Sequence, residues 1–148
     1  MIFPIGDDQV KGGYFPFFSY GFILLNIAFF IYKITLSLDQ QDDFDFYFGA
    51  IPAEITIGQD LFTLITSMFL HGDWWHLIGN MLFLWVFADN IEATVGSFRF
   101  LLFYILGGLA AVVSHIYFNP DSQVPMVGAS GAISAVMGAY LIMYPHSK

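Results

Sequence analysis

The sequence has no cysteine and few charged residues. The absence of cysteine among 148 residues excludes disulfides and thiolate metal sites. Charged residues make up 11% of the chain and hydrophobic residues 57%, whereas a soluble domain carries roughly 25% charged residues. So few charges cannot cover a water-facing surface, which predicts lipid as the solvent. Acidic residues outnumber basic ones by 12 to 4, no nucleic-acid partner is expected, and no removable signal peptide is evident.

Long apolar stretches are what the sequence does contain. A transmembrane helix needs about 20 mostly apolar residues, and four stretches qualify, at about 15–38, 74–93, 98–118 and 127–144. Residues 39–70 hold six acidic residues, no lysine or arginine, and many interleaved apolar side chains. This composition predicts a loop in the membrane interface that contains short helices. We therefore predict an all-α, polytopic transmembrane helix bundle formed by one domain over residues 1–148.

The few basic residues predict the orientation of the bundle. Lysine and arginine favour the cytoplasmic side, and a cytoplasmic N-terminus puts Lys11, Arg99 and Lys148 on that side. Lys33 then lies near the outer end of the first helix, where its stem is expected to snorkel towards water. The acidic 39–60 segment lies outside. Because no organelle transit peptide is visible, a prokaryotic inner membrane is expected.

Polar residues inside membrane helices are costly and point to function. His76 and Asn80 are four residues apart and share one face of the second stretch. His71 would lie about 7.5 Å further outward if that helix extended so far. Ser130 and Ser134 share a face of the fourth stretch. Both stretches run inward from the outer surface, so the imidazole, carboxamide and hydroxyl lie at similar depth, as an acyl-transfer site requires.

Glycines flank Ser130 at the start of the fourth stretch. Gly128 and Gly131 leave room for close backbone approach, and free N–H groups at a helix N-terminus favour an anion. Packing is the alternative interpretation, because Ser130, Ser134 and Gly138 form a stripe of small residues that suits helix contact in membranes. For an isolated serine, packing is the commoner role. The coincidence of these groups at one depth favours function.

Two motifs resemble those of the rhomboid family of intramembrane serine proteases. His71, His76 and Asn80 are similar to its His-x4-His-x3-Asn signature, and residues 127–134 resemble its Gly-x-Ser-Gly nucleophile motif. Glu92 with Gly96 matches its Glu-x3-Gly pattern at the end of the second helix. The resemblance covers roughly residues 15–145, and the two motifs in this order are specific.

The resemblance implies a role for each matched residue. Ser130 is the expected nucleophile, and His76, Asn80 and the Ser130 backbone N–H form the expected oxyanion hole. Gly128 shapes the substrate cleft, with Gly131 and Ser134 as supporting residues. Other implied roles are support of the second helix by His71 and structural roles for Glu92 and Gly96. No metal or cofactor is expected, and the expected partners are the lipid bilayer and transmembrane protein substrates.

The chain also departs from the family pattern. Phe62-Thr63 stands about where many members have a Trp-Arg pair, so the anchoring of the first loop is unassigned. The family core has six helices, with a general-base histidine on the sixth, whereas this sequence ends at Lys148 after four. His146 is expected at the opposite membrane face, and no sequence feature aims His115 at Ser130. The base is therefore expected outside this chain, for example on a companion chain, and the chain alone is predicted inactive.

Three functions remain to be compared. The first is an intramembrane serine endopeptidase that cleaves transmembrane substrates near the outer surface. The second is a non-catalytic relative that binds or chaperones membrane proteins with the same fold. The intact serine motif and oxyanion residues favour the first, since a binding module has no need of them. A small channel or transporter requires ionisable residues at mid-membrane, and the candidates here lie near helix ends.

Overall fold

The computed structural model describes residues 13–145, and this part of the chain is helical. Its elements are α1 (Phe17–Ile34), α2 (Leu38–Phe48), α3 (Pro52–Thr56), α4 (Thr63–Thr66), η1 (Ser67–Phe69), α5 (Trp74–Phe83), η2 (Leu84–Ala88), α6 (Asp89–Val95), α7 (Ser97–Phe118) and α8 (Ser130–Met143). The described residues form no strand, and their one isolated β-bridge joins Ala50 to Met126. The all-α prediction is confirmed, as are the short helices of the first loop.

The four predicted apolar stretches are helical, and two of the helices have the length of a membrane span. By length and apolarity, α1 and α7 are long enough to cross a membrane, whereas α8, with 14 residues, is shorter than such a span. The second predicted stretch is a continuous helical run over residues 74–95, whose middle turn, η2, is π-helical. Residues 127–129 lie before α8 rather than in it. Lys11, His146 and Lys148 lie outside the described residues.

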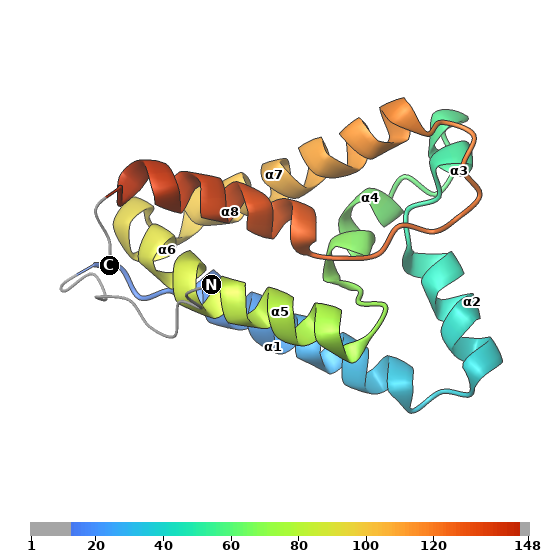
Figure 1. The fold of residues 1–148 in the computed structure, drawn as a ribbon, viewed down its shortest axis with the longest axis horizontal. Helices are drawn as coiled ribbons and strands as arrows, with labels where there is room; N and C mark the ends of the chain where they lie inside the picture. Colours follow the sequence, from blue (N-terminus) through green and yellow to red (C-terminus); the bar gives the residue numbers. More distant parts are fainter. Residues whose placement is uncertain (1–12, 146–148) are drawn as a thin grey trace.

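The long helices run back and forth along the molecule. In Figure 1, α1 and α7 run away from the end of the molecule at which α6 lies, and α5 and α8 run back towards it. Helix α8 packs against both α7 and α5, and α5 packs against α1. The first residues of α5 and α8 therefore lie towards the same end of the molecule as α2, α3 and α4. This arrangement is the one that the depth argument predicts.

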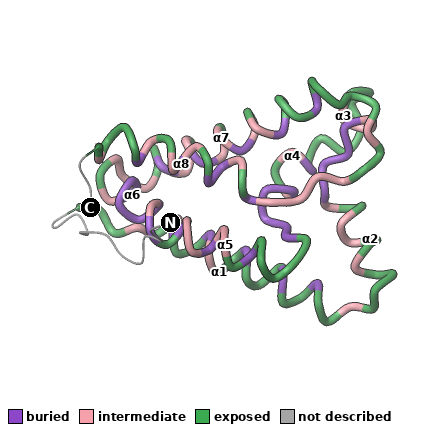
Figure 2. Tube along the Cα trace, viewed as in Figure 1, coloured by how far each residue is buried: buried purple, intermediate pink, exposed green. Residues whose placement is uncertain are grey.

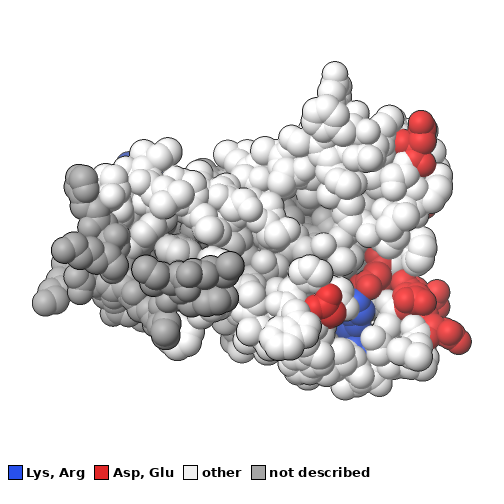
Figure 3. Space-filling view, viewed as in Figure 1, with Lys and Arg blue, Asp and Glu red and all other residues white. Residues whose placement is uncertain are grey.

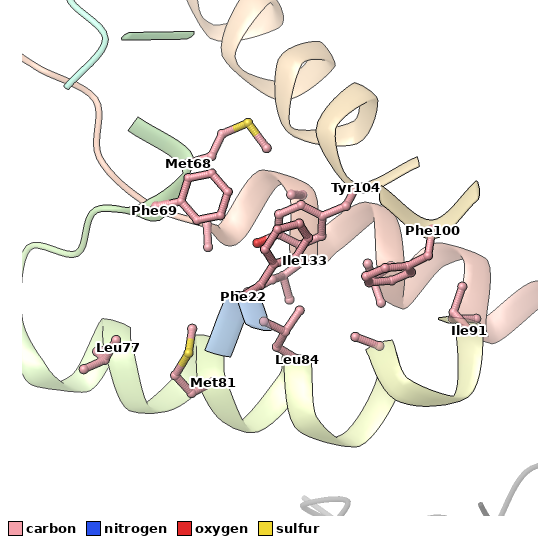
Figure 4. Close-up of a cluster of buried hydrophobic side chains, with 14 of the residues drawn as sticks. Phe22, Met68, Phe69, Leu77, Met81, Leu84, Ile91, Phe100, Tyr104 and Ile133 are labelled. Carbon is pink, nitrogen blue, oxygen red and sulfur yellow. The ribbon is translucent and has the colours of Figure 1, made fainter. Parts of the chain in front are cut away.

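Aromatic and aliphatic side chains fill the space between the helices. Phe22 of α1 packs against Tyr104 of α7, with ring centroids 4.5 Å apart, and Phe69 joins them from η1. Figure 4 shows this cluster at the junction of α1, α5, α7 and α8. Figure 2 shows the buried residues on the inward sides of the helices and exposed ones on the outward sides. Those outward sides carry large apolar residues such as Leu24 and Leu106, as expected of surfaces that face lipid.

Helices α7 and α8 approach closely through small residues. A Cβ atom on Gly131 would lie 2.4 Å from the Cβ of Ala111, and one on Gly107 would lie 2.6 Å from the Cβ of Ala135. Among the described residues, the predicted stripe does not form this contact, since Ser134 is exposed and a Cβ on Gly138 would meet nothing within 4 Å. The close contact is therefore formed by another face of α8 than the stripe of small residues suggested as a packing surface.

Glu92 joins the start of α1 to α6. Its side chain is fully buried, and its carboxylate accepts hydrogen bonds from the backbone N–H of Phe18 (2.9 Å), the backbone N–H of Ser19 (2.7 Å) and the Ser19 hydroxyl (2.7 Å). A carboxylate at a helix N-terminus satisfies free N–H groups and complements the dipole. Gly96, with φ of 89°, makes the turn into α7. These contacts support the structural roles predicted for both residues.

Lys33 is buried, so the prediction that it snorkels towards water is wrong. Its ammonium forms an ion pair with Asp45 of α2 and donates a hydrogen bond to the backbone carbonyl of His71 at 3.2 Å. The reason is that α2 folds back on α1 and brings the carboxylate of Asp45 within reach of the Lys33 ammonium. The ion pair compensates the buried charge, so the side chain does not need to extend to water. Figure 3 shows blue basic atoms next to red acidic ones at this end of the molecule. This pair anchors the first loop, for which the sequence suggested no anchor.

Candidate active site

The start of α5 is fixed by Asp73. Its carboxylate Oδ1 accepts a hydrogen bond from the backbone N–H of His76 at 3.0 Å, which makes Asp73 the N-cap of the helix. The helix therefore begins at Trp74. His71 lies before it and not on an extension of it, so the axial distance estimated for His71 from helical geometry does not apply. The cap was readable in the sequence, because aspartate before an apolar helical run is a start signal.

His71 supports Asn80 from outside the helix. Its side chain is buried, and its Nε2 lies 2.9 Å from Nδ2 of Asn80. Burial, with smaller effects from His76 and Lys33, lowers the pKa of His71 to about 4. A neutral ring that carries its proton on Nδ1 accepts a hydrogen bond from the Asn80 amide at Nε2. This contact orients the carboxamide that the sequence assigns to the oxyanion hole.

The depressed pKa of His71 predicts a pH-dependent stability. In the unfolded chain the ring binds a proton near pH 6.5, whereas in the folded state it does so only near pH 4. Between these values the unfolded state binds more protons, so stability is lost as the pH falls from about 6.5 towards 4, by up to about 3 kcal/mol. Thermal unfolding in detergent should show this loss for the wild type and much less of it for His71→Gln.

His115→Gln is the matched control for this measurement. His115 is an exposed histidine at the far end of α7, so its replacement should leave the acid-induced loss of stability as in the wild type. If His71→Gln and the wild type lose the same stability between pH 7 and pH 5, the buried imidazole is not its source.

His76 is paired with the capping carboxylate. Its Nδ1 lies 2.6 Å from Oδ2 of Asp73, while most of the imidazole surface is exposed. The backbone N–H of His76 is the main cause that lowers the pKa of Asp73, and the His76 side chain adds to it. Asp73 is therefore a carboxylate at neutral pH. It is a site residue for which the sequence suggested no role.

Ser130 is the first residue of α8 and is exposed. The chain enters the helix through Gly128, whose φ of 137° strains any residue with a side chain. The backbone N–H of Gly128 donates to the Ser67 carbonyl at 2.9 Å, which ties this turn to the end of the first loop. Ser130 therefore stands where the free N–H groups and the dipole of α8 favour a negative charge.

One cavity brings the predicted residues together. It has a volume of about 230 Å³ and lies between the start of α5 and the turn before α8. Its lining residues are His71, Gly72, Asp73, His76, Asn80, Val127, Gly128 and Ser130. An imidazole, a carboxamide and a hydroxyl thus share one small space, as the common depth predicted.

Other residues named from the sequence lie elsewhere. Gly131 lines a second cavity of about 220 Å³, which also borders Ser130 and reaches His115. Ser134 lines neither of these two cavities, and its hydroxyl donates to the Ser130 carbonyl at 2.7 Å. Within residues 13–145 no group of histidine and acidic side chains has the arrangement of a metal site. The chemistry that this arrangement can support is attack by Ser130, with His76 and Asn80 beside it.

Known proteins match this chain in the same region. The family model described as the Rhomboid domain matches residues 58–148, which include both motifs and the whole cavity. The chain belongs to the rhomboid family. As a family member with long apolar helices, it is an integral membrane protein.

Curated relatives include bacterial and mitochondrial rhomboids. Rhomboid protease AarA of Providencia stuartii is 33% identical over 135 residues, which cover 81% of this chain and 48% of the relative. Rhomboid protease GluP of Bacillus subtilis (strain 168) is 35% identical over 127 residues, covering 85% of this chain and 24% of the relative. Rhomboid protein 1, mitochondrial, of Saccharomyces cerevisiae is 31% identical over 58% of this chain and 26% of its own length. The chain thus spans about half or less of these relatives.

Proposed function

We propose that this chain carries the nucleophile and oxyanion hole of an intramembrane serine endopeptidase. The observation that supports it best is the cavity in which Ser130, His76 and Asn80 meet. The family and the relatives named rhomboid proteases support the same reaction class. Its substrates are transmembrane proteins, and its solvent is the lipid bilayer.

The proposed reaction begins at the Ser130 hydroxyl. Its oxygen bonds to the carbonyl carbon of the substrate peptide, the hydroxyl proton passes to a base, and the carbonyl oxygen becomes an oxyanion. Asn80, His76 and the backbone N–H of Ser130 stabilise that charge. No hydrogen bond joins the Ser130 hydroxyl to a histidine of the described residues, and we assign the base to a histidine outside residues 1–148. A companion segment or chain supplies it.

The proposed topology follows from charge and depth. We assign four membrane crossings of a six-helix core to residues 1–148, with the N-terminus in the cytoplasm. The acidic first loop and the Ser130 cavity then lie on the outer side, so cleavage occurs near the outer surface, where water is available. We assign the protein to a prokaryotic inner membrane.

A binding or chaperone module is the second candidate. The feature that favours it is an apolar groove of about 730 Å³ between α1 and α5, bordered by Ile27, Met81 and Trp85 among others. A groove of this size suits an apolar partner, and binding there needs no nucleophile. The endopeptidase remains the better proposal, because the groove does not explain the polar groups gathered around Ser130.

Covalent labelling tests the proposed nucleophile. The full-length protein in detergent is treated with a fluorophosphonate, digested, and mapped by mass spectrometry. Modification is expected at Ser130, because an activated serine beside an oxyanion hole reacts with such probes. The exposed hydroxyl of Ser114, on α7, provides an internal control that should stay unmodified. Modification of Ser114 to the same extent, or none at Ser130, would contradict the assignment.

A further inference from the structure

The contact between Asp73 and His76 determines which nitrogen of the His76 ring carries a hydrogen. One carboxylate oxygen of Asp73 caps α5, and the other lies 2.6 Å from Nδ1 of His76. A carboxylate only accepts hydrogen bonds. The hydrogen in this contact therefore belongs to Nδ1 of His76, whatever the protonation of the rest of the ring.

This contact restricts the other ring nitrogen of His76. With Nδ1–H committed to Asp73, a neutral imidazole has no hydrogen on Nε2 and cannot donate there. Nε2 carries a hydrogen only when the ring is doubly protonated. An oxyanion needs a donor, so His76 can serve the oxyanion hole through Nε2 only as an imidazolium.

We infer, on the basis of the proposed function, that Asp73 is a positioning residue. Because of its contact with Nδ1, His76 can stabilise the oxyanion only when its ring is doubly protonated. The Asp73–imidazolium ion pair holds the ring so that Nε2–H is the donor for the Ser130 cavity. When the ring carries only the Nδ1 hydrogen, the donor at Nε2 is lost although Ser130 and Asn80 are unchanged.

The surroundings of His76 fit this inference. The ionisable side chains that line the cavity with it are Asp73 and His71, both from the segment before α5. His71 is buried and neutral at pH 7 because its pKa is lowered to about 4. On the side of α8, the cavity is lined by Val127, Gly128 and the Ser130 hydroxyl, none of which is charged at neutral pH. Asp73 therefore supplies the one charge in contact with the imidazole within the described cavity.

The substitution Asp73→Asn keeps the N-cap of α5 but removes the negative charge beside His76. Asparagine is as good an N-cap as aspartate, so its carbonyl oxygen can keep the bond from the backbone N–H of His76. Its amide N–H can then donate to Nδ1, which places the single proton of a neutral ring on Nε2. In this variant the donor survives deprotonation of the imidazolium.

The experiment is the pH profile of fluorophosphonate labelling at Ser130, measured on the full-length protein in detergent. For the wild type, the labelling rate should fall with rising pH, by about tenfold per pH unit on the alkaline limb. For Asp73→Asn, the rate at pH 9 should stay within about threefold of its value at pH 7. Asp121→Asn removes an exposed carboxylate from the loop before α8 and should keep the wild-type profile.

Other outcomes separate the possible failures. A wild-type profile without an alkaline limb, or an Asp73→Asn profile that keeps it, overturns the inference. Loss of labelling in Asp73→Asn at every pH by about 10³-fold or more also overturns it, because that result makes neutral His76 a proton acceptor held in the wrong tautomer. Asp73→Ser, which also retains a capping oxygen, should lose the alkaline limb too. Labelling that does not depend on Ser130 refutes the proposed function and not this pairing.

Discussion

Replacing Ser130 with alanine is expected to lower peptide-bond cleavage by about 10⁴- to 10⁶-fold. The hydroxyl oxygen is the atom that bonds to the substrate in the proposed reaction, and the remaining groups of the cavity supply only orientation and charge stabilisation. Cleavage of a transmembrane model substrate by the full-length protein in liposomes measures this loss. The change should appear in kcat, since Ser130 contributes little to binding of the intact substrate helix.

The fold should tolerate this replacement. Ser130 is exposed, its hydroxyl forms no hydrogen bond within residues 13–145, and Ala129 rather than Ser130 is the N-cap of α8. The stability should therefore change by no more than about 0.5 kcal/mol. Ser114→Ala is the matched control, because Ser114 is an exposed serine of α7 whose hydroxyl donates to the Ala110 carbonyl. If both variants cleave at the same rate, the catalytic assignment of Ser130 is wrong.

The sequence predicted the parts of the site that depend on helix positions. Apolar stretches place His76 and Ser130 near the starts of two helices that run in the same direction, and their common depth follows from that alone. Cavity-lining residues His71, Asn80 and Gly128 were named from the same motifs. Motif spacing therefore predicted most residues of the candidate site, because the spacing of residues along a helix determines their positions.

The remaining features depend on how chain segments meet in space. Lys33 and Asp45 pair only because α2 folds back on α1, and the hydrophobic pattern of the sequence does not predict this reversal. His71 lies before the N-cap of α5 and contacts Asn80 within that helix. The position predicted for His71 by counting residues along one helix was therefore wrong. The sequence also could not show which face of α8 packs on α7, since small residues occupy adjacent faces and only packing shows which one is used.

Breaking the Lys33–Asp45 pair is expected to cost about 3 kcal/mol of stability. In Lys33→Met the stem is replaced by a side chain of similar length, but the Asp45 carboxylate loses its cation and the His71 carbonyl loses a donor. Removing one partner of a buried pair typically costs 3–5 kcal/mol, and the lower value applies because the Asp45 side chain keeps 21% of its surface exposed. Unfolding in mild detergent measures this loss, and limited proteolysis should cut the 39–70 loop faster.

Two further variants show that the pair, and not either residue alone, is responsible. Asp43→Asn removes an exposed carboxylate from the same helix α2 and should change stability by no more than about 0.5 kcal/mol. Lys33→Met combined with Asp45→Leu leaves no unpaired buried charge, so it should recover most of the loss, because hydrophobic replacement of a buried pair is often neutral. A double variant as unstable as Lys33→Met would mean that the hydrogen bond to the His71 carbonyl, rather than the ion pair, anchors the loop beside the cavity.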